Sequence, residues 1–254
     1  MAAAAAEEGR LKLLGFWSSP FVLRTRYALN LKGIPYTNVE EDLFGAKSEL
    51  LLAANPAHGG KVPALLLPDG RSVSESLIIV EYLDEAFPGT PPRLLPSDPH
   101  RRATARFWAA HVDGALLPAW IPLYGGSTAE ERVEAARRVV GVLETFEGVL
   151  RRGDCCSSGE EEEGGFGFFG GDSVGLVDVV LGGFIGWLRA SEAMCGVKTI
   201  EDGSRTPLLA AWAERFAALE GVREILPEVG RLVEYNQMKR ALRGLPFLPP
   251  HQQQ

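Results

Sequence analysis

Residues 11–42, LKLLGFWSSPFVLRTRYALNLKGIPYTNVEED, decide the fold of the first part of this chain. The apolar run 11–16 has the length of a short buried strand, whereas residues 21–32 carry apolar side chains at helical spacing and stop at Gly33. The segment YTNVEED, which follows, has the composition of a second strand. The stretch therefore predicts a β-α-β unit.

The next elements continue this alternation up to residue 86. Residues 47–53 predict a short helix, and VPALLLPDGRSV, residues 62–73, predicts a hairpin that turns at its Pro-Asp-Gly sequence. A helix over residues 75–86 closes the unit. We therefore expect an α/β domain over residues 10–87.

The pattern changes after this domain. Residues 88–99 are rich in proline, which neither a helix nor an interior strand accepts in such numbers, so they predict a linker. Residues 100–240 show apolar side chains at helical spacing and no convincing strand pattern. The second domain is therefore predicted to be an all-helical bundle of about five helices.

The composition limits the function classes. The chain has 254 residues, 46% of them hydrophobic, and a net charge of -7. A nucleic-acid partner is not expected, because phosphates are neutralised by clustered Lys and Arg. No stretch reaches the ~18 apolar residues of a membrane span, and the first residues lack the features of a secretion signal. We therefore expect a cytoplasmic protein that acts on small molecules and has no membrane partner.

Two features of the middle of the chain are not expected to carry chemistry. Cys155, Cys156 and Cys195 have neither the number of a disulfide framework nor the spacing of a metal site, so we expect no metal and no permanently bound cofactor. The Gly- and Glu-rich stretch 153–171 predicts a mobile, solvated loop, with partner binding as the alternative.

Ser19, in the segment WSSPF, has two interpretations. It directly precedes Pro20, and proline favours the first position of a helix, so the Ser19 hydroxyl is expected to cap that helix. The same position lies at the positive end of the helix dipole, where a thiolate is stabilised and can accept a hydrogen bond from the hydroxyl. The residue pattern leaves both interpretations open.

Four segments together resemble the plant tau-class glutathione transferases. They are WSSPF, NPAHGGKVPALL, SESLIIVEYLDEAF and GGDSVGLVD, and the resemblance extends from about residue 11 to residue 247. It implies an N-terminal thioredoxin-like domain, a C-terminal all-helical domain and a homodimer. It also implies an enzyme of detoxification or stress metabolism that conjugates its co-substrate glutathione to hydrophobic electrophiles, with glutathione peroxidase as a side activity.

The sequence departs from the family pattern at two places. Gly59 and Gly60 stand where members often carry lysine beside the histidine, and the acidic loop is longer than the usual connector.

The family motif places the serine that stabilises the thiolate directly before Pro-Phe, so the resemblance assigns that role to Ser19 and leaves Ser18 as its rival. An unperturbed thiol has a pKa of about 8.5, and lowering it by ~2 units requires about 2.7 kcal/mol. One charge-assisted hydrogen bond of ~1.5 to 3 kcal/mol, with a dipole contribution of up to ~1 kcal/mol, is sufficient. The hydroxyl therefore needs neither a base nor a metal.

The resemblance also implies how the glutathione peptide is bound. Val62-Pro63 is expected to be a cis peptide that presents the backbone of Val62 to the cysteinyl unit, like an added strand. Lys47 is expected near the glycine carboxylate, with Lys61 as a weaker candidate. In the structural interpretation, Pro63 only marks the start of a strand.

Glu75 and Ser76 are expected at the other end of the peptide. The resemblance implies that Glu75 pairs with the α-amino group of the γ-glutamyl unit and that Ser76 holds its carboxylate at a helix start. Both are also ordinary residues for the first turn of a helix.

The electrophile is expected to bind between the domains, where the apolar face of residues 107–120 meets the WSSPF segment. Aromatic residues at helical spacing are equally typical of a plain core, so both interpretations stay open. Arg24 and Arg26 are expected on a solvated helix face, from which they would add positive potential. The expected lining residues are Trp17, Phe21, Trp108, His111 and Trp120.

Asp178 stands three residues after Gly175, as in a capping box, which predicts a role in folding at a helix start. Two other functions are alternatives. A non-catalytic carrier of hydrophobic compounds or glutathione conjugates shares every feature above. A thiol-redox enzyme of the dehydroascorbate reductase type is disfavoured, because it would need cysteine where Ser19 stands.

Overall fold

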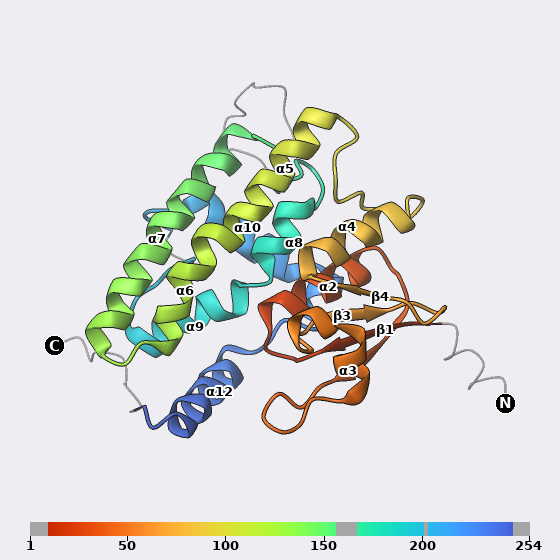
Figure 1. The fold of residues 1–254 in the computed structure, drawn as a ribbon. Helices are drawn as coiled ribbons and strands as arrows, with labels where there is room; N and C mark the ends of the chain where they lie inside the picture. The colour runs from red at the N-terminus through yellow and green to blue at the C-terminus, as the bar shows by residue number, and fades with distance from the viewer. Residues whose placement is uncertain (1–9, 156–166, 201–202, 246–254) are drawn as a thin grey trace.

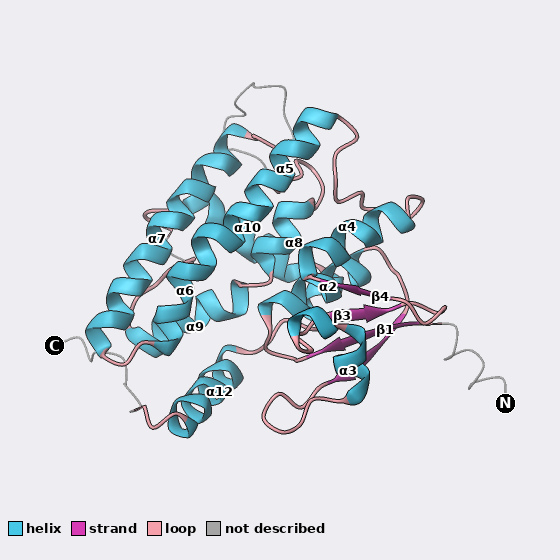
Figure 2. Ribbon diagram, viewed as in Figure 1, coloured by secondary structure: helices cyan, strands magenta, loops and turns pink. Residues whose placement is uncertain are grey.

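The structure of the chain is a computed structural model that describes residues 10–155, 167–200 and 203–245. Figure 1 shows a smaller part that contains a sheet and a larger part built from helices, and in Figure 2 the strands of the described residues lie in the smaller part. The last helix of the first part is α4 (Ser76–Ala86), and the second part begins with α5 (Pro99–His111). The predicted order of an α/β domain and an all-helical domain is confirmed.

The sheet has four strands in the order β2-β1-β3-β4. β1 (Leu11–Gly15) runs parallel to β2 (Tyr36–Glu40) and is connected to it through α2 (Pro20–Leu31), which confirms the predicted β-α-β unit. β3 (Ala64–Leu66) and β4 (Ser72–Ser74) form the predicted antiparallel hairpin, and β3 also pairs antiparallel with β1.

Alternate residues of β1 pack against opposite helix layers, as the two-residue period of a strand requires. Leu13 pairs with Leu65 and lies in the large core, to which α2 and α4 also contribute. Leu14 pairs with Ala64 and lies in a small cluster with Leu51. Leu51 belongs to α3 (Glu49–Ala54), which the 3-10 turn η1 (Pro56–His58) follows. The first domain is thus a sheet between two helix layers, the thioredoxin-like arrangement.

A buried ion pair attaches the linker to the first domain. Lys32 and Asp84 are both buried, with 2.9 Å between Nζ and Oδ1. Lys32 also donates to two carbonyl groups of the linker, those of Thr90 and Pro92, and Asp84 accepts from the amide groups of two linker leucines. These contacts therefore fix the conformation of the linker against the first domain.

The described residues of the second domain contain eight α-helices, so the expectation of about five is wrong. Helical spacing does not show a break when the next helix starts at once: the π-helical segment η2 (Val112–Leu116) joins α5 directly to α6, and only two residues separate α8 from α9. The helices after α5 are α6 (Leu117–Gly125), α7 (Ala129–Arg152), α8 (Leu176–Gly182), α9 (Ile185–Cys195), α10 (Pro207–Ala218), α11 (Glu220–Arg223) and α12 (Val229–Leu242).

Asp178 is the centre of a buried hydrogen-bond network in the helical domain. Its carboxylate accepts from the amide of Gly175 at 2.7 Å, which confirms the predicted role at the start of α8. It also accepts from the amides of Phe169 and Gly170 and from the indole of Trp212. Burial raises the pKa of Asp178 to about 6, although the four N–H donors favour the charged form.

The two domains are in close contact at the start of α2. A Cβ atom on Gly183 would lie 2.5 Å from the carbonyl oxygen of Pro20, so only glycine permits this approach of the backbones. The indole of Trp187, on α9, donates to the carbonyl of Ser18 at 2.7 Å. The helical domain therefore fixes the segment that contains Ser19.

Within the described ranges, no helix combines the length and the apolar character that a membrane crossing requires. Cys155 and Cys195 are both buried. Cys156 and the acidic residues 160–163 lie outside the described residues, and with them most of the predicted mobile loop.

Candidate active site

Ser19 caps α2 with the acceptor side of its hydroxyl. Its Oγ accepts a hydrogen bond from the amide of Val22 at 3.4 Å, which confirms the capping interpretation. A hydroxyl has one hydrogen to donate besides its lone pairs, and the cap leaves that hydrogen unused. The first turn of α2 contains no acidic residue, so the positive end of the helix dipole is not neutralised locally. Capping and thiolate binding by Ser19 are therefore compatible.

Ser18 is in a different position from its neighbour. It is buried, with 3% of its surface exposed, and its carbonyl is held by Trp187. Ser19 is half-buried and so reaches the surface of the molecule. The geometry favours Ser19 over Ser18 for contact with a bound molecule.

Glu75 has a strained backbone. Its φ of 71° is the only positive value among the described residues other than glycine. Such a conformation costs about 1 kcal/mol or more and is found where a function holds the residue in place. The Glu75 carbonyl accepts from the amide of Ile79 and thus begins α4, whose first residue, Ser76, is buried. An exposed carboxylate and a helix start are therefore adjacent, as binding of the γ-glutamyl unit would require.

One turn of the chain contacts two of the charged side chains that are expected to bind glutathione. His58 Nδ1 lies 2.9 Å from Glu75 Oε1, and Lys47 Nζ donates to the carbonyl of Gly59 at 2.8 Å. Gly59 and Gly60 have φ values of 59° and 68°, which residues with a side chain rarely adopt. The two glycines are thus suited to this turn, whose residues contact Lys47 and Glu75.

The peptide bond between Val62 and Pro63 is cis, as expected. Within the described part of the chain, neither backbone polar group of Val62 is paired, so both are available to an added peptide. The carbonyl of Lys61 accepts from the side chain of Asn55 at 2.9 Å, while Lys61 itself is exposed.

Arg24 is fully buried, so its expected place on a solvated face is wrong. Its guanidinium donates to both carboxylate oxygens of Asp113, at 3.1 and 2.6 Å, and to the carbonyl of Val180 at 3.0 Å. It also donates to the hydroxyl of Ser76 at 3.3 Å. Burial lowers the pKa of Arg24, and the Asp113 carboxylate opposes that shift. Arg24 therefore connects Ser76 to the helical domain, whereas Arg26 is half-buried.

Aromatic rings from both domains surround the Ser19 segment and form what we call the interdomain aromatic cluster. Neighbouring rings in it have centroids 4.8 to 6.2 Å apart. Three of the expected electrophile-site residues belong to it, namely Trp17, Phe21 and Trp120. Its members are Phe16, Trp17, Phe21, Phe44, Trp120, Tyr124, Phe184, Trp187 and Tyr235.

Trp108 and His111 lie in a separate cluster inside the helical domain. Both rings contact Phe146, at 5.9 and 5.8 Å, and the contacts continue through Phe169 to Trp212. No ring contact within the described ranges joins this cluster to the interdomain aromatic cluster. Trp108 and His111 are half-buried against Phe146 of the helical core, and no ring contact among the described residues joins them to Trp17.

Several residues of the site were missed by sequence reasoning. Asp113 and Trp187 lie on helices, whose spacing shows which face is buried but not which partner from the other domain it meets. Tyr235 reaches the site from α12, more than two hundred residues after Trp17. Only His58 had a signal, because it stands in NPAHGGKVPALL, one of the segments that carry the family resemblance.

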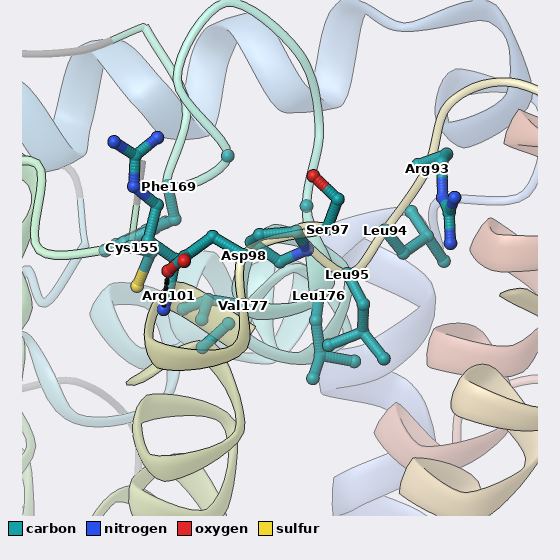
Figure 3. A pocket seen from close by; sticks show the side chains of 14 residues that line it. Arg93, Leu94, Leu95, Ser97, Asp98, Arg101, Cys155, Phe169, Leu176 and Val177 are labelled. Carbon is teal, nitrogen blue, oxygen red and sulfur yellow. Dashed lines mark hydrogen bonds between the residues drawn. The ribbon is translucent and has the colours of Figure 1, made fainter. Parts of the chain in front are cut away.

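The described residues contain no group of His, Cys, Asp and Glu that could hold a metal ion. A cavity of about 290 Å³ lies elsewhere, between the linker, the start of α5 and the loop before α8. Figure 3 shows it bordered by Arg93 and Leu94 on one side and by Cys155 and Phe169 on the other. None of the expected glutathione-binding residues is among the described residues that line it.

Comparison with known proteins agrees with this architecture. Residues 18–86 match the family model of the glutathione S-transferase N-terminal domain, and residues 109–215 match that of the C-terminal domain. The probable glutathione S-transferase GSTU6 of rice (Oryza sativa subsp. japonica) is 49% identical, over 91% of this chain and 95% of its own length. Glutathione S-transferase U17 of Arabidopsis thaliana is 42% identical, over 89% and 93%.

Two solved structures have closely similar folds. The tau-class glutathione S-transferase MiGSTU of mango (Mangifera indica) has a TM-score of 0.79 and 39% identity, and the match covers 91% of this chain and 99% of that one. Rice GST1 (OsGSTU1), solved in complex with glutathione, has the same TM-score and identity, with 92% and 100% covered. By its sequence and by both of its domains, this chain belongs to the tau class of the glutathione S-transferase family.

Proposed function

We propose that this protein conjugates glutathione to hydrophobic electrophiles and that Ser19 stabilises the glutathione thiolate. The observation that carries the proposal is the geometry of Ser19, whose oxygen caps α2 while its hydrogen stays available to a sulfur at the helix start. A hydrogen bond of this kind and the helix dipole both favour the anion over the thiol. The curated relatives are named as transferases, which supports catalysis rather than carriage.

The reaction needs no further catalytic group. In aromatic substitution the thiolate sulfur attacks the activated carbon, a C–S bond forms, and the leaving group departs with the electron pair of its bond. When the thiolate instead adds to an activated double bond, a C–S bond forms at one carbon, and the carbanion left at the other carbon takes a proton from water. In both cases the thiolate is the nucleophile, and the Ser19 hydroxyl keeps its proton throughout.

Other residues of the first domain would position the peptide. Glu75 would pair with the α-amino group and Ser76 would hold the γ-glutamyl carboxylate at the start of α4, while Val62, presented by the cis bond to Pro63, would pair with the cysteinyl backbone. At the other end, Lys47 and, more weakly, Lys61 would approach the glycine carboxylate. The electrophile would lie against the interdomain aromatic cluster.

The test is the ionisation of bound glutathione in Ser19→Ala. Thiolate absorbance during a pH titration of the binary complex should show the thiol pKa moving up toward that of free glutathione, and kcat/KM for chlorodinitrobenzene near neutral pH should fall at least about tenfold. Ser18→Ala is the matched control and should stay close to wild type. Unchanged ionisation and turnover in Ser19→Ala would leave Ser19 as a cap only.

We also propose that the protein is a cytoplasmic homodimer. Ile78 on α4 and Phe107 on α5 are 56% and 59% exposed, and Arg106 and Glu81 join the same two helices at 2.7 Å. Exposed apolar side chains on neighbouring helices are typical of a subunit contact. Sedimentation should give twice the chain mass, and a monomer at every concentration tested would contradict the homodimer. Cell fractionation should find the protein in the cytosol.

A further inference from the structure

Lys239 is a cation held among the rings of the interdomain aromatic cluster. Its Nζ donates to the hydroxyl of Tyr124 at 3.2 Å and lies 5.6 and 5.5 Å from the ring centroids of Tyr124 and Tyr235. The residue is half-buried on α12. An ammonium group has three hydrogens to donate, and one of them is used by Tyr124.

This cation is connected through aromatic rings to the segment that contains Ser19. The rings of Tyr124 and Tyr235 both contact Trp187, at 5.3 and 6.2 Å. The indole of Trp187 in turn holds the Ser18 carbonyl at 2.7 Å. Trp17, which precedes the two serines, also contacts Tyr235, at 5.5 Å. Lys239 is therefore one ring contact removed from the side chain that fixes the Ser19 segment.

Two of the cations beside these rings have no ion-pair partner in the part of the chain that the structure describes. Neither Lys239 nor Arg231, which lies 3.9 Å from the ring centroid of Trp17, forms an ion pair within the described residues. Arg24, the other cation over these rings, is paired with Asp113. The carboxylate of Glu40 accepts from the amide of Trp17 and is exposed.

We propose, on the basis of the function proposed above, that Lys239 is a specificity-determining residue that selects electrophiles carrying a carboxylate. The aromatic rings would hold the hydrophobic body of such a molecule. A carboxylate on it would then take the free N–H groups of an ammonium that is already partly removed from water, where an ion pair is stronger than at an open surface. A neutral electrophile of the same shape gains nothing from this charge.

The experiment compares an acid with its ester. Chloronitrobenzoate and its methyl ester both react with the thiolate by losing chloride, and they differ in charge at the position para to the chlorine. The quantity measured is the ratio of kcat/KM for the acid to kcat/KM for the ester, in wild type, Lys239→Met, Lys239→Gln and Lys239→Arg. Lys198→Met, which changes an exposed lysine beyond the end of α9, is the matched control.

The acid-to-ester ratio should fall about tenfold in Lys239→Met and in Lys239→Gln, return to near the wild-type value in Lys239→Arg, and stay unchanged in Lys198→Met. In wild type, added salt should lower kcat/KM for the acid more than for the ester, because salt screens the charge. This second measurement does not depend on how any variant folds.

The outcomes separate the two proposals. A ratio that does not respond to Lys239, or an equal loss on acid and ester, would show that Lys239 only attaches α12 and would overturn this inference. If wild type converts neither compound, or converts both without dependence on Ser19, the proposed function fails and the inference fails with it.

Discussion

Arg24 and Asp178 are both fully buried charged residues, yet they organise different parts of the molecule. Arg24 binds Asp113 and Val180 of the helical domain and, from the first domain, Ser76 of the expected glutathione site. Asp178 binds four N–H groups that all belong to the helical domain. One network crosses between the domains, and the other stays within one of them.

The comparison shows that burial of a charge does not by itself mark a functional site. Burial disfavours the charged form of both groups, and it therefore lowers the pKa of Arg24 and raises that of Asp178. What separates them is the set of partners, since only Arg24 contacts a residue expected to bind substrate. We therefore expect Asp178 to affect stability alone and Arg24 to affect stability and substrate binding together.

Removal of the Asp178 carboxylate should cause the largest loss of stability among these variants. Asp178→Ala leaves four buried N–H donors without an acceptor, and the free energy of unfolding should fall by about 4 kcal/mol in urea titrations. The affinity of the remaining folded protein for glutathione, measured by calorimetry, should not change. Asp98→Ala removes an exposed cap of α5 and should cost only about 1 kcal/mol. A loss of glutathione affinity at unchanged stability would place Asp178 in the site.

Replacement of Arg24 should give a smaller loss of stability with an added change in binding. Arg24→Met leaves Asp113 unpaired, but that side chain is 31% exposed, so the loss should be about 2 kcal/mol. Because Ser76 loses its partner, KM for glutathione should rise about fivefold while kcat at saturation changes less.

The matched control for Arg24 is Arg132→Met. Arg132 is also buried and donates to carbonyls of Leu123 and Met194, both in the helical domain. It should lower stability and leave KM for glutathione unchanged. If the two arginine variants raised KM equally, the distinction between the two networks would be lost.

The smallest predicted effect is a pH dependence of the free energy of unfolding. Its measurement tests whether Asp178 is charged in the folded protein. Its pKa rises from 3.8 to about 6 on folding, so the folded state binds the proton more tightly than the unfolded state. The contribution of this group to stability therefore increases as pH falls through about 6 and is lost as pH rises through it.

Asp178→Asn removes this titration and serves as the reference. Between about pH 7 and pH 5, the free energy of unfolding of wild type minus that of the variant should increase by roughly 1 kcal/mol. A difference that stays flat, or that decreases toward acid, would mean that the four donors outweigh burial and that Asp178 remains ionised.

Local patterns in the sequence predicted the elements whose cause is local. The β-α-β unit, the hairpin at Pro68 and the cap of α2 by Ser19 depend on residues a few positions apart, and the structure contains each of them. The predicted number of helices was wrong because the breaks between helices have causes that are not local. The break after α8 lies where the chain packs against α2. The spacing of apolar residues in α8 does not indicate this packing.

The candidate site also contains residues that short motifs predicted and partners that they did not predict. The side chains expected from the family resemblance, from Ser19 to Ser76, lie in one domain and in short motifs. The partners that orient them come from distant segments: Asp113 for Arg24, Trp187 for Ser18 and Tyr235 for Trp17. For Trp108 and His111, helical spacing identified a buried face but not which cluster the face belongs to.

The sequence alone determined the order of the two domains, the strands and helices of the first, and the serine at the start of α2, because hydrophobic spacing, proline and capping act over a few residues. Only the tertiary structure decided that Arg24 is buried, that His58 meets Glu75, and that Lys239 lies against the rings of Tyr124 and Tyr235. These contacts join residues far apart in the chain, and their formation depends on how whole domains pack together.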